Sequence, residues 1–170
     1  ESRGLGDVYK RQTQQLNSLE RELDMFFCCC GGGGLMAGTA LALSKHFRQA
    51  KLYTVEPDGL DDTARSLAAG KRQTNDPSAR SICDAIVTPS PGLLTFPIVQ
   101  SKAAGGKVVT DEEALSAMKT AWDYFKLTVE PGGAVALAAS LKQEVIASHT
   151  GDKRKTCLLY TSPSPRDSSK

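Results

Sequence analysis

Residues 25–38 read MFFCCCGGGGLMAG, an apolar run that passes through four glycines into a second apolar segment. Its first part, Met25–Cys30, is wholly apolar and bounded by Asp24 and the glycines, as expected for a central strand covered on both faces. Residues 35–47 are rich in alanine and leucine and end in a cationic turn, which predicts a helix. The order strand, glycine loop, helix is typical of an α/β fold.

The loop Gly31–Gly34 is the first candidate site. Backbone N–H groups and a helix N-terminus meet at such a loop, and together they bind anions such as phosphate. Glycine suits this role because side chains would block close approach. The loop lacks the Gly-Lys-Ser/Thr of a Walker motif and the usual spacing of the dinucleotide fingerprint. A tight turn that only packs the helix against the sheet remains the structural alternative.

The rest of the chain alternates strand and helix patterns, which predicts a mainly parallel sheet with flanking helices. The predicted strands are 51–55 and 107–109, with a short extended piece at 127–129, and the predicted helices are 14–23, 61–69, 93–103, 110–125 and 134–146. Thr110 and Glu113 form the capping-box pattern of a helix start. Residues 70–91 are predicted to be irregular and Glu130-Pro131-Gly132-Gly133 to form a turn. About 140 residues are too few for both halves of a large cofactor enzyme.

Composition excludes several classes of protein. The formal net charge is +2 and no apolar run approaches the length of a membrane span, so we expect no nucleic-acid or membrane partner. The N-terminus lacks the pattern of a signal peptide, and we expect a soluble, cytoplasmic parent protein. Adjacent cysteines on a strand point to opposite faces, so Cys28, Cys29 and Cys30 are expected to be buried thiols rather than zinc ligands.

The two ends of the chain have an unusual relationship. Residues 7–12 and 157–162 can be encoded by opposite strands of one DNA sequence, which resembles a transposon end used in sequencing adapters. We therefore expect residues 1–12 and 157–170 to be adapter-derived scars, with residues 13–156 as the genuine coding segment. A disordered polar tail is the alternative for the Ser/Pro-rich C-terminal end.

Several motifs in register connect the chain to a known family. These are the loop with its flanks, residues 30–38, and the later segments 55–57, 94–97, 108–127 and 129–136. In this order and at similar spacings they resemble fold-type II pyridoxal-phosphate enzymes, within the threonine/serine dehydratase and serine racemase group. The resemblance implies that residues 13–156 are a partial catalytic domain of that fold.

The resemblance also implies roles for individual residues. The glycine loop of the family holds the phosphate of pyridoxal 5'-phosphate, which assigns that role to Gly31, Gly32, Gly33, Gly34 and the amide of Leu35. Glu130 corresponds to a glutamate near the cofactor ring and is the catalytic candidate. It could instead simply begin a turn.

Metal-dependent members of the family bind a divalent cation just after the second strand. This maps onto the carboxylates of Glu56 and Asp62 and the carbonyl of Leu60, oxygen ligands that suit Mg²⁺, Mn²⁺ or Ca²⁺. The alternative is a turn in which Glu56 is a surface carboxylate and the aspartates favour a helix N-terminus.

The family's cofactor-binding lysine and its partner for the pyridine nitrogen belong to motifs that this sequence does not contain. The implied activity of the parent is conversion of a small hydroxy amino acid to a 2-oxo acid and ammonia, in a homo-oligomer, and the chain alone is expected to be inactive. A serine racemase, a 3-hydroxyaspartate ammonia-lyase, or a non-catalytic module that binds a phosphate ligand are the alternatives. A further alternative is that the chain does not fold on its own.

Overall fold

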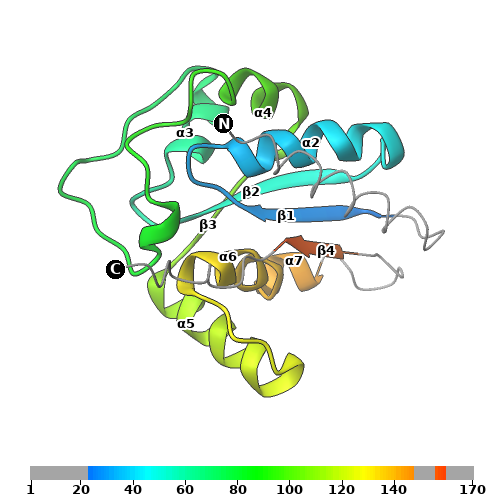
Figure 1. Ribbon diagram of the computed structural model, residues 1–170, viewed down its shortest axis with the longest axis vertical. Helices are drawn as coiled ribbons and strands as arrows, with labels where there is room; N and C mark the ends of the chain where they lie inside the picture. The colour runs from blue at the N-terminus through cyan, green and yellow to red at the C-terminus, as the bar shows by residue number, and fades with distance from the viewer. Residues whose placement is uncertain (1–22, 148–155, 160–170) are drawn as a thin grey trace, which may run out of the picture.

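The computed structural model describes residues 23–147 and 156–159, and within them four parallel strands form one sheet (Figure 1). The strands are β1 Met25–Cys29, β2 Lys51–Pro57, β3 Gly105–Val109 and β4 Thr156–Leu159, and their order is β3-β2-β1-β4. Register is continuous across the centre, with Cys29 opposite Val55 and Val55 opposite Lys107. The predicted mainly parallel sheet is therefore confirmed.

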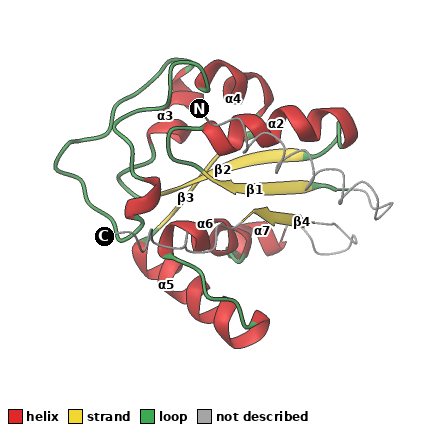
Figure 2. Ribbon diagram, viewed as in Figure 1, coloured by secondary structure: helices red, strands yellow, loops and turns green. Residues whose placement is uncertain are grey.

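Helices cover both faces of this sheet (Figure 2). On one face lie α2 Gly34–His46, α3 Asp62–Ala69 and α4 Phe96–Lys102; on the other lie α5 Asp111–Thr120, α6 Pro131–Ser140 and α7 Gln143–Ala147. Two single turns complete the described elements, a 3-10 turn η1 Asp84–Ile86 and a π-helical turn η2 Ala121–Phe125. The fold is a helix–sheet–helix sandwich, the arrangement expected of strands that are apolar on both sides.

The central strand β1 explains this arrangement. All five of its residues are buried, and successive side chains enter opposite cores. Phe26 and Cys28 pack in the cluster that contains α2 residues, whereas Phe27 and Cys29 pack in the cluster that contains residues of α5 and α6. The predicted separation of neighbouring cysteines onto opposite faces is confirmed.

Several predicted helix boundaries are confirmed by local geometry. The capping box is present, with Glu113 N donating to Thr110 Oγ1 at 3.2 Å and Thr110 N donating to the Glu113 carboxylate at 2.8 Å. Gly70 ends α3 in the left-handed conformation at φ 69°. Residues 70–91 form no regular element except η1, as predicted for an irregular segment.

Two local predictions are wrong. Residues 130–133 are not a separate turn, because α6 begins at Pro131 and includes both following glycines. The predicted helix 134–146 is divided, since α6 ends at Ser140 and α7 starts at Gln143. Residues 127–129, for which the sequence predicted only a short extended piece, lie outside the four strands of the sheet.

Two predictions about the chain ends stay predictions. Cys157–Leu159, placed by sequence in the suspected C-terminal scar, belong to β4 and pair with β1. This pairing describes how the segment lies, and the adapter origin of residues 1–12 and 157–170 stays a hypothesis. The helix expected at 14–23 falls almost entirely outside the described residues.

Within residues 23–147 and 156–159, the helices are too short or too polar to span a bilayer. The cytoplasmic location stays a prediction from the sequence.

Candidate functional site

The glycine loop joins the end of β1 to the start of α2. Gly33 is the N-cap of α2, and the first helical hydrogen bond runs from Ala37 N to Gly33 O at 2.8 Å. The amides of the first turn, from Gly34 to Met36, therefore lie ahead of the helical ladder. The positive end of the helix dipole lies at the same place, so the loop has the geometry expected of an anion site, and binding of phosphate there stays a prediction.

A cavity of about 440 Å³ opens at this loop. Its lining comprises Cys29, Cys30, Gly31, Gly32, Gly33, Gly34, Leu35, Met36, Ala85, Ile86, Thr88 and Glu130. The structure thus brings together all five predicted cofactor-binding residues and the predicted catalytic residue Glu130. The volume lies within the range of small-molecule sites, roughly 300 to 1,000 Å³.

The lining also shows how the site would recognise an anion. It contains a carboxylate but neither lysine nor arginine, as far as the described part of the chain is concerned. Recognition of phosphate here would rest on main-chain amides and the helix terminus rather than on a cationic side chain.

Two of the glycines are required by their surroundings. A Cβ on Gly31 would lie 3.0 Å from the main-chain oxygen of Ile86, which cannot easily move. Gly33 has φ of +84°, and a Cβ there would lie 2.9 Å from Thr95 Oγ1. Gly34 differs, because a Cβ at this position meets nothing within 4 Å. The loop is therefore crowded by Ile86 at Gly31 and by Thr95 at Gly33, and it is open at Gly34.

The outer wall of the cavity was not predicted. Ala85, Ile86 and Thr88 come from the irregular segment between α3 and α4, which folds back over the glycine loop. The sequence offered one signal, a long segment without regular structure, which indicates function without indicating which residues act.

Glu130 lies at the N-terminus of α6. Its backbone carbonyl accepts hydrogen bonds from Gly133 N and Ala134 N, both at 3.0 Å, and so it is the N-cap residue of that helix. Its position in the lining of the cavity, together with the glycine loop, agrees with a role beside a bound ring. The same backbone geometry explains why the residue also has a structural function.

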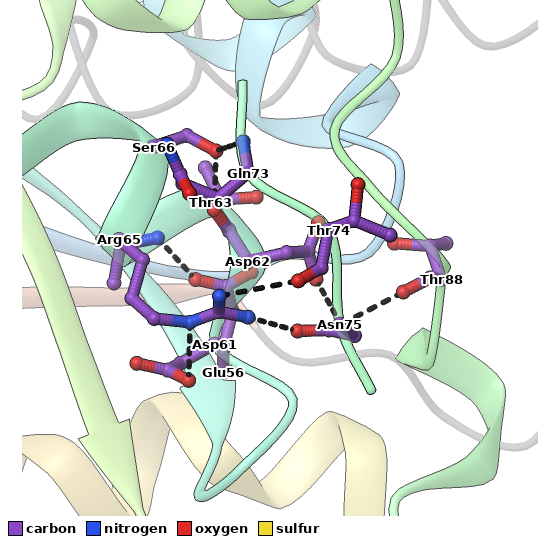
Figure 3. A network of polar contacts seen from close by, with 11 residues as sticks. Glu56, Asp61, Asp62, Thr63, Arg65, Ser66, Gln73, Thr74, Asn75 and Thr88 are labelled. Carbon is purple, nitrogen blue, oxygen red and sulfur yellow. Dashed lines mark hydrogen bonds and ion pairs between the residues drawn. The ribbon is translucent and has the colours of Figure 1, made fainter. Parts of the chain in front are cut away.

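The predicted cation ligands Glu56 and Asp62 lie between the end of β2 and the start of α3 (Figure 3). Glu56 is buried, and its two carboxylate oxygens accept from Thr63 N at 2.9 Å and from Ala64 N at 2.7 Å. Glu56 therefore caps α3 from the neighbouring strand. The alternative in which it is a surface carboxylate is wrong.

Asp62 is equally buried and belongs to a different network. Its Oδ1 accepts from Asn75 Nδ2 at 2.5 Å, and Asn75 Nδ2 also donates to the carbonyl of Thr88 at 2.9 Å (Figure 3). The guanidinium of Arg65 donates to Asn75 Oδ1 and, at 3.1 Å, to Asp61. Through Asn75, the carboxylate site is connected to Thr88 in the wall of the cavity.

Burial controls the protonation of both carboxyl groups. It raises the pKa of Glu56 to about 8 and also raises the pKa of Asp62. Asp62 Oδ2 is buried and has no hydrogen-bond partner among the described residues. Asp62 Oδ2 is therefore the one carboxylate oxygen of this pair that a hard cation could take without displacing a donor, because both oxygens of Glu56 already accept main-chain hydrogen bonds.

The third predicted ligand, Leu60, lies in the turn between these carboxylates. Leu60 is buried and its amide donates to Pro57 O at 3.1 Å. Among the described residues no group of three His, Cys, Asp or Glu side chains could hold a metal ion. A cation here would thus need a main-chain oxygen and water to complete its coordination.

Comparison with known proteins identifies the class. The family described as "Pyridoxal-phosphate dependent enzyme" matches residues 6–162. The chain belongs to this family, and its α/β sheet is that of a fold-type II domain.

Individual relatives have different activities. A serine racemase from Dictyostelium discoideum is 39% identical over 135 residues, 78% of this chain and 41% of that protein. An L-threo-3-hydroxyaspartate ammonia-lyase from Pseudomonas sp is 36% identical over 131 residues, 76% of this chain and 41% of that protein. The crystal structure of a threonine deaminase from T.th. superposes with a TM-score of 0.83 at 30% identity, covering 95% of this chain and 57% of that one. The chain spans about two fifths of the length of these curated relatives.

Proposed function

We propose that the protein to which this chain belongs is a pyridoxal-phosphate-dependent ammonia-lyase that converts a small hydroxy amino acid, threonine or serine, to a 2-oxo acid and ammonia. One observation carries the proposal: a cradle of main-chain amides at Gly31–Leu35 faces the same cavity as Glu130. When bound, the cofactor supplies the electron sink that stabilises negative charge at the substrate α-carbon.

The residues of this chain contribute binding and orientation. The amides of the glycine loop and the first turn of α2 hold the phosphate, with Gly34 keeping the approach free of side chains. Glu130, at the N-terminus of α6, orients water or polar groups next to the ring. Ile86 and Thr88 close the wall and exclude solvent from the phosphate side.

We also propose that Glu56, Asp62 and the carbonyl of Leu60 bind Mg²⁺, Mn²⁺ or Ca²⁺. The orphaned Asp62 Oδ2 and the raised pKa of both carboxyl groups support this assignment. The role is structural, because the cation would hold β2 and α3 together next to the segment that walls the cofactor cavity. Isothermal titration of the chain with Mg²⁺, Mn²⁺ and Ca²⁺ measures it, and unchanged heats in Asp62→Asn would contradict it.

Serine racemase and 3-hydroxyaspartate ammonia-lyase activity are the competing functions, and relatives with both names resemble the chain. The complete parent enzyme, supplied with cofactor, should be assayed on serine, threonine and 3-hydroxyaspartate. Release of 2-oxo acid and ammonia from threonine or serine supports the dehydratase. Formation of D-serine as the main product would favour the racemase instead, and turnover of 3-hydroxyaspartate alone would favour the 3-hydroxyaspartate ammonia-lyase.

The 170-residue chain itself should have no dehydratase activity. The family's cofactor-binding lysine motif is absent from the sequence, so cofactor bound through its phosphate would not be linked to the protein. Measurable turnover of threonine by the purified chain would overturn this part of the proposal. We further propose that the parent is a homo-oligomer, which sedimentation velocity of the complete enzyme measures.

A further inference from the structure

The carbonyl of Gly32 is held by two donors outside the cavity. Gly92 N donates to it at 3.1 Å and Thr95 Oγ1 at 2.6 Å. Neither Gly92 nor Thr95 belongs to the cavity lining, whereas Gly32 and Gly33 do. The carbonyl therefore points away from the cavity, toward the segment that leads into α4.

This orientation determines where the next amide points. The peptide bond between Gly32 and Gly33 is trans, so its C=O and N–H point in opposite directions. Because the carbonyl faces Thr95, the N–H of Gly33 faces the cavity. Glycine has little intrinsic preference for one peptide orientation, so a loop of four glycines needs an external constraint.

Thr95 supplies that constraint with a hydroxyl that would ordinarily cap its own helix. It is the N-cap of α4, a position where a threonine hydroxyl usually accepts a hydrogen bond from its own helix. Its side chain makes no such bond. The single hydroxyl proton has two acceptors in reach, Gly32 O at 2.6 Å and Gly92 O at 3.3 Å, and the shorter contact identifies Gly32 as the acceptor.

The hydrogen bond between Thr95 Oγ1 and Gly32 O is closely surrounded by backbone atoms. A Cβ on Gly92 would lie 2.6 Å from Thr95 Oγ1 and 2.9 Å from Gly32 O. A Cβ on Gly33 would lie 2.9 Å from the same hydroxyl. The bond is thus enclosed by two glycines, and a side chain at either position would crowd the hydroxyl of Thr95.

We propose that Thr95 is a positioning residue for the phosphate of the bound ligand: its hydroxyl locks the Gly32–Gly33 peptide so that the Gly33 amide is presented to the anion. The ligand class is a phosphate monoester, and this inference rests on the proposed function for that identity. Thr95 acts through the loop and does not itself contact the ligand.

The test compares Thr95→Val, which removes the hydroxyl at nearly constant shape, with Thr95→Ser, which retains it. Ser101→Ala is the matched control, because this hydroxyl on α4 donates to Ile98 O at 2.8 Å, away from the loop. Inorganic phosphate and pyridoxal 5'-phosphate are titrated into the 170-residue chain. Calorimetry measures the affinity for each ligand. ¹H–¹⁵N correlation spectra measure the chemical-shift change of the Gly33 amide on binding.

We expect Thr95→Val to weaken both ligands about fivefold, as for loss of one constraining hydrogen bond, and to abolish the phosphate-induced shift of the Gly33 amide. Thr95→Ser and Ser101→Ala should bind as the unsubstituted chain does. Equal binding by the valine variant, or equal loss in the serine variant, overturns the role of the hydroxyl while leaving the proposed function intact. Absence of phosphate binding by an unsubstituted chain whose dispersed ¹H–¹⁵N spectrum shows that it is folded overturns the proposed function and, with it, this inference.

Discussion

Asn75 and Asp62 are joined side chain to side chain, with Nδ2 of the amide 2.5 Å from Oδ1 of the carboxylate, and both are almost fully buried. The same amide nitrogen reaches the carbonyl of Thr88 at 2.9 Å. One side chain therefore connects the candidate cation site to the wall of the cofactor cavity. The irregular segment that contains Asn75 therefore contributes a contact to each site.

Replacing Asn75 with alanine should destabilise the chain by about 2 to 3 kcal/mol, because a buried carboxylate loses a charge-assisted donor. Chemical denaturation measures this loss. Gln100→Ala is the control, since its exposed amide donates to Gly70 O at 3.1 Å, and it should cost less than about 0.5 kcal/mol. Equal losses of stability in the two variants would show that the buried Asn75–Asp62 hydrogen bond contributes no more than an exposed one.

Alanine at Gly33 and at Gly34 should have different consequences. Gly33→Ala should destabilise the fold by about 1 to 2 kcal/mol, because the φ of +84° is unfavourable for any residue with a Cβ. Gly34→Ala should keep the stability, because a Cβ there meets nothing within 4 Å. Its methyl group would instead stand at the cavity wall and lower the affinity for phosphate. Thermal melts and phosphate titrations of both variants separate the two effects.

Without divalent cations the stability of the chain should fall as the pH rises from about 4.5 to about 8. Burial raises the folded-state pKa of Glu56 to about 8 from its ordinary value of 4.5, so the folded state binds more protons over this interval. The contribution is complete below the lower value and is lost as the pH passes through the upper one. Asp62, whose pKa is also raised by burial, acts in the same direction.

Denaturation in EDTA at several pH values measures this slope. Glu56→Gln should flatten it at a lower overall stability, because the amide keeps only one acceptor for the two main-chain donors. Glu112→Gln, at a carboxylate on α5 outside this network, should keep the slope of the unsubstituted chain. Added Mg²⁺ should also flatten the dependence of stability on pH. If the dependence is the same with and without Mg²⁺, the proposed cation site is contradicted.

The contact between β3 and α3 should be sensitive to one methyl group. A Cβ on Gly106 would overlap the Ala64 side chain and lie 2.6 Å from Ala64 Cα. Gly106→Ala should therefore cost about 1 to 3 kcal/mol through overpacking. Ala64→Gly in the same chain should recover part of that loss in a double-mutant cycle, and strict additivity would refute the overlap.

The strand, glycine loop and helix could be predicted because their signals are local. An apolar run, a glycine run and an alanine-rich run follow one another, and each determines its own conformation. The Thr110 and Glu113 pair was predictable for the same reason, since a capping box is complete within one helical turn. The residues proposed to hold the phosphate therefore came from sequence alone.

Other features depend on distant partners. Gly132 and Gly133 signal a turn locally, yet they lie inside α6, where a Cβ on Gly132 would be 3.4 Å from Ile86. This is an ordinary contact distance, so the packing of α6 beside Ile86 does not by itself require a glycine at position 132. The contribution of Thr88 and the hydroxyl contact of Thr95 could not be predicted either, because both arise from residues far apart in sequence.

The cradle at Gly31–Leu35 is made of main-chain groups, and every residue type except proline carries the same N–H. Apart from proline, no side-chain replacement there can delete a donor, so the site has an unusual pattern of genetic vulnerability. Substitutions in this loop should be damaging because they add side-chain atoms, and the loss of function should increase with the size of the new side chain. In a saturation library, tolerance at Gly34 should therefore follow side-chain volume, whereas at Gly33 every residue with a Cβ should be penalised because of the φ of +84°.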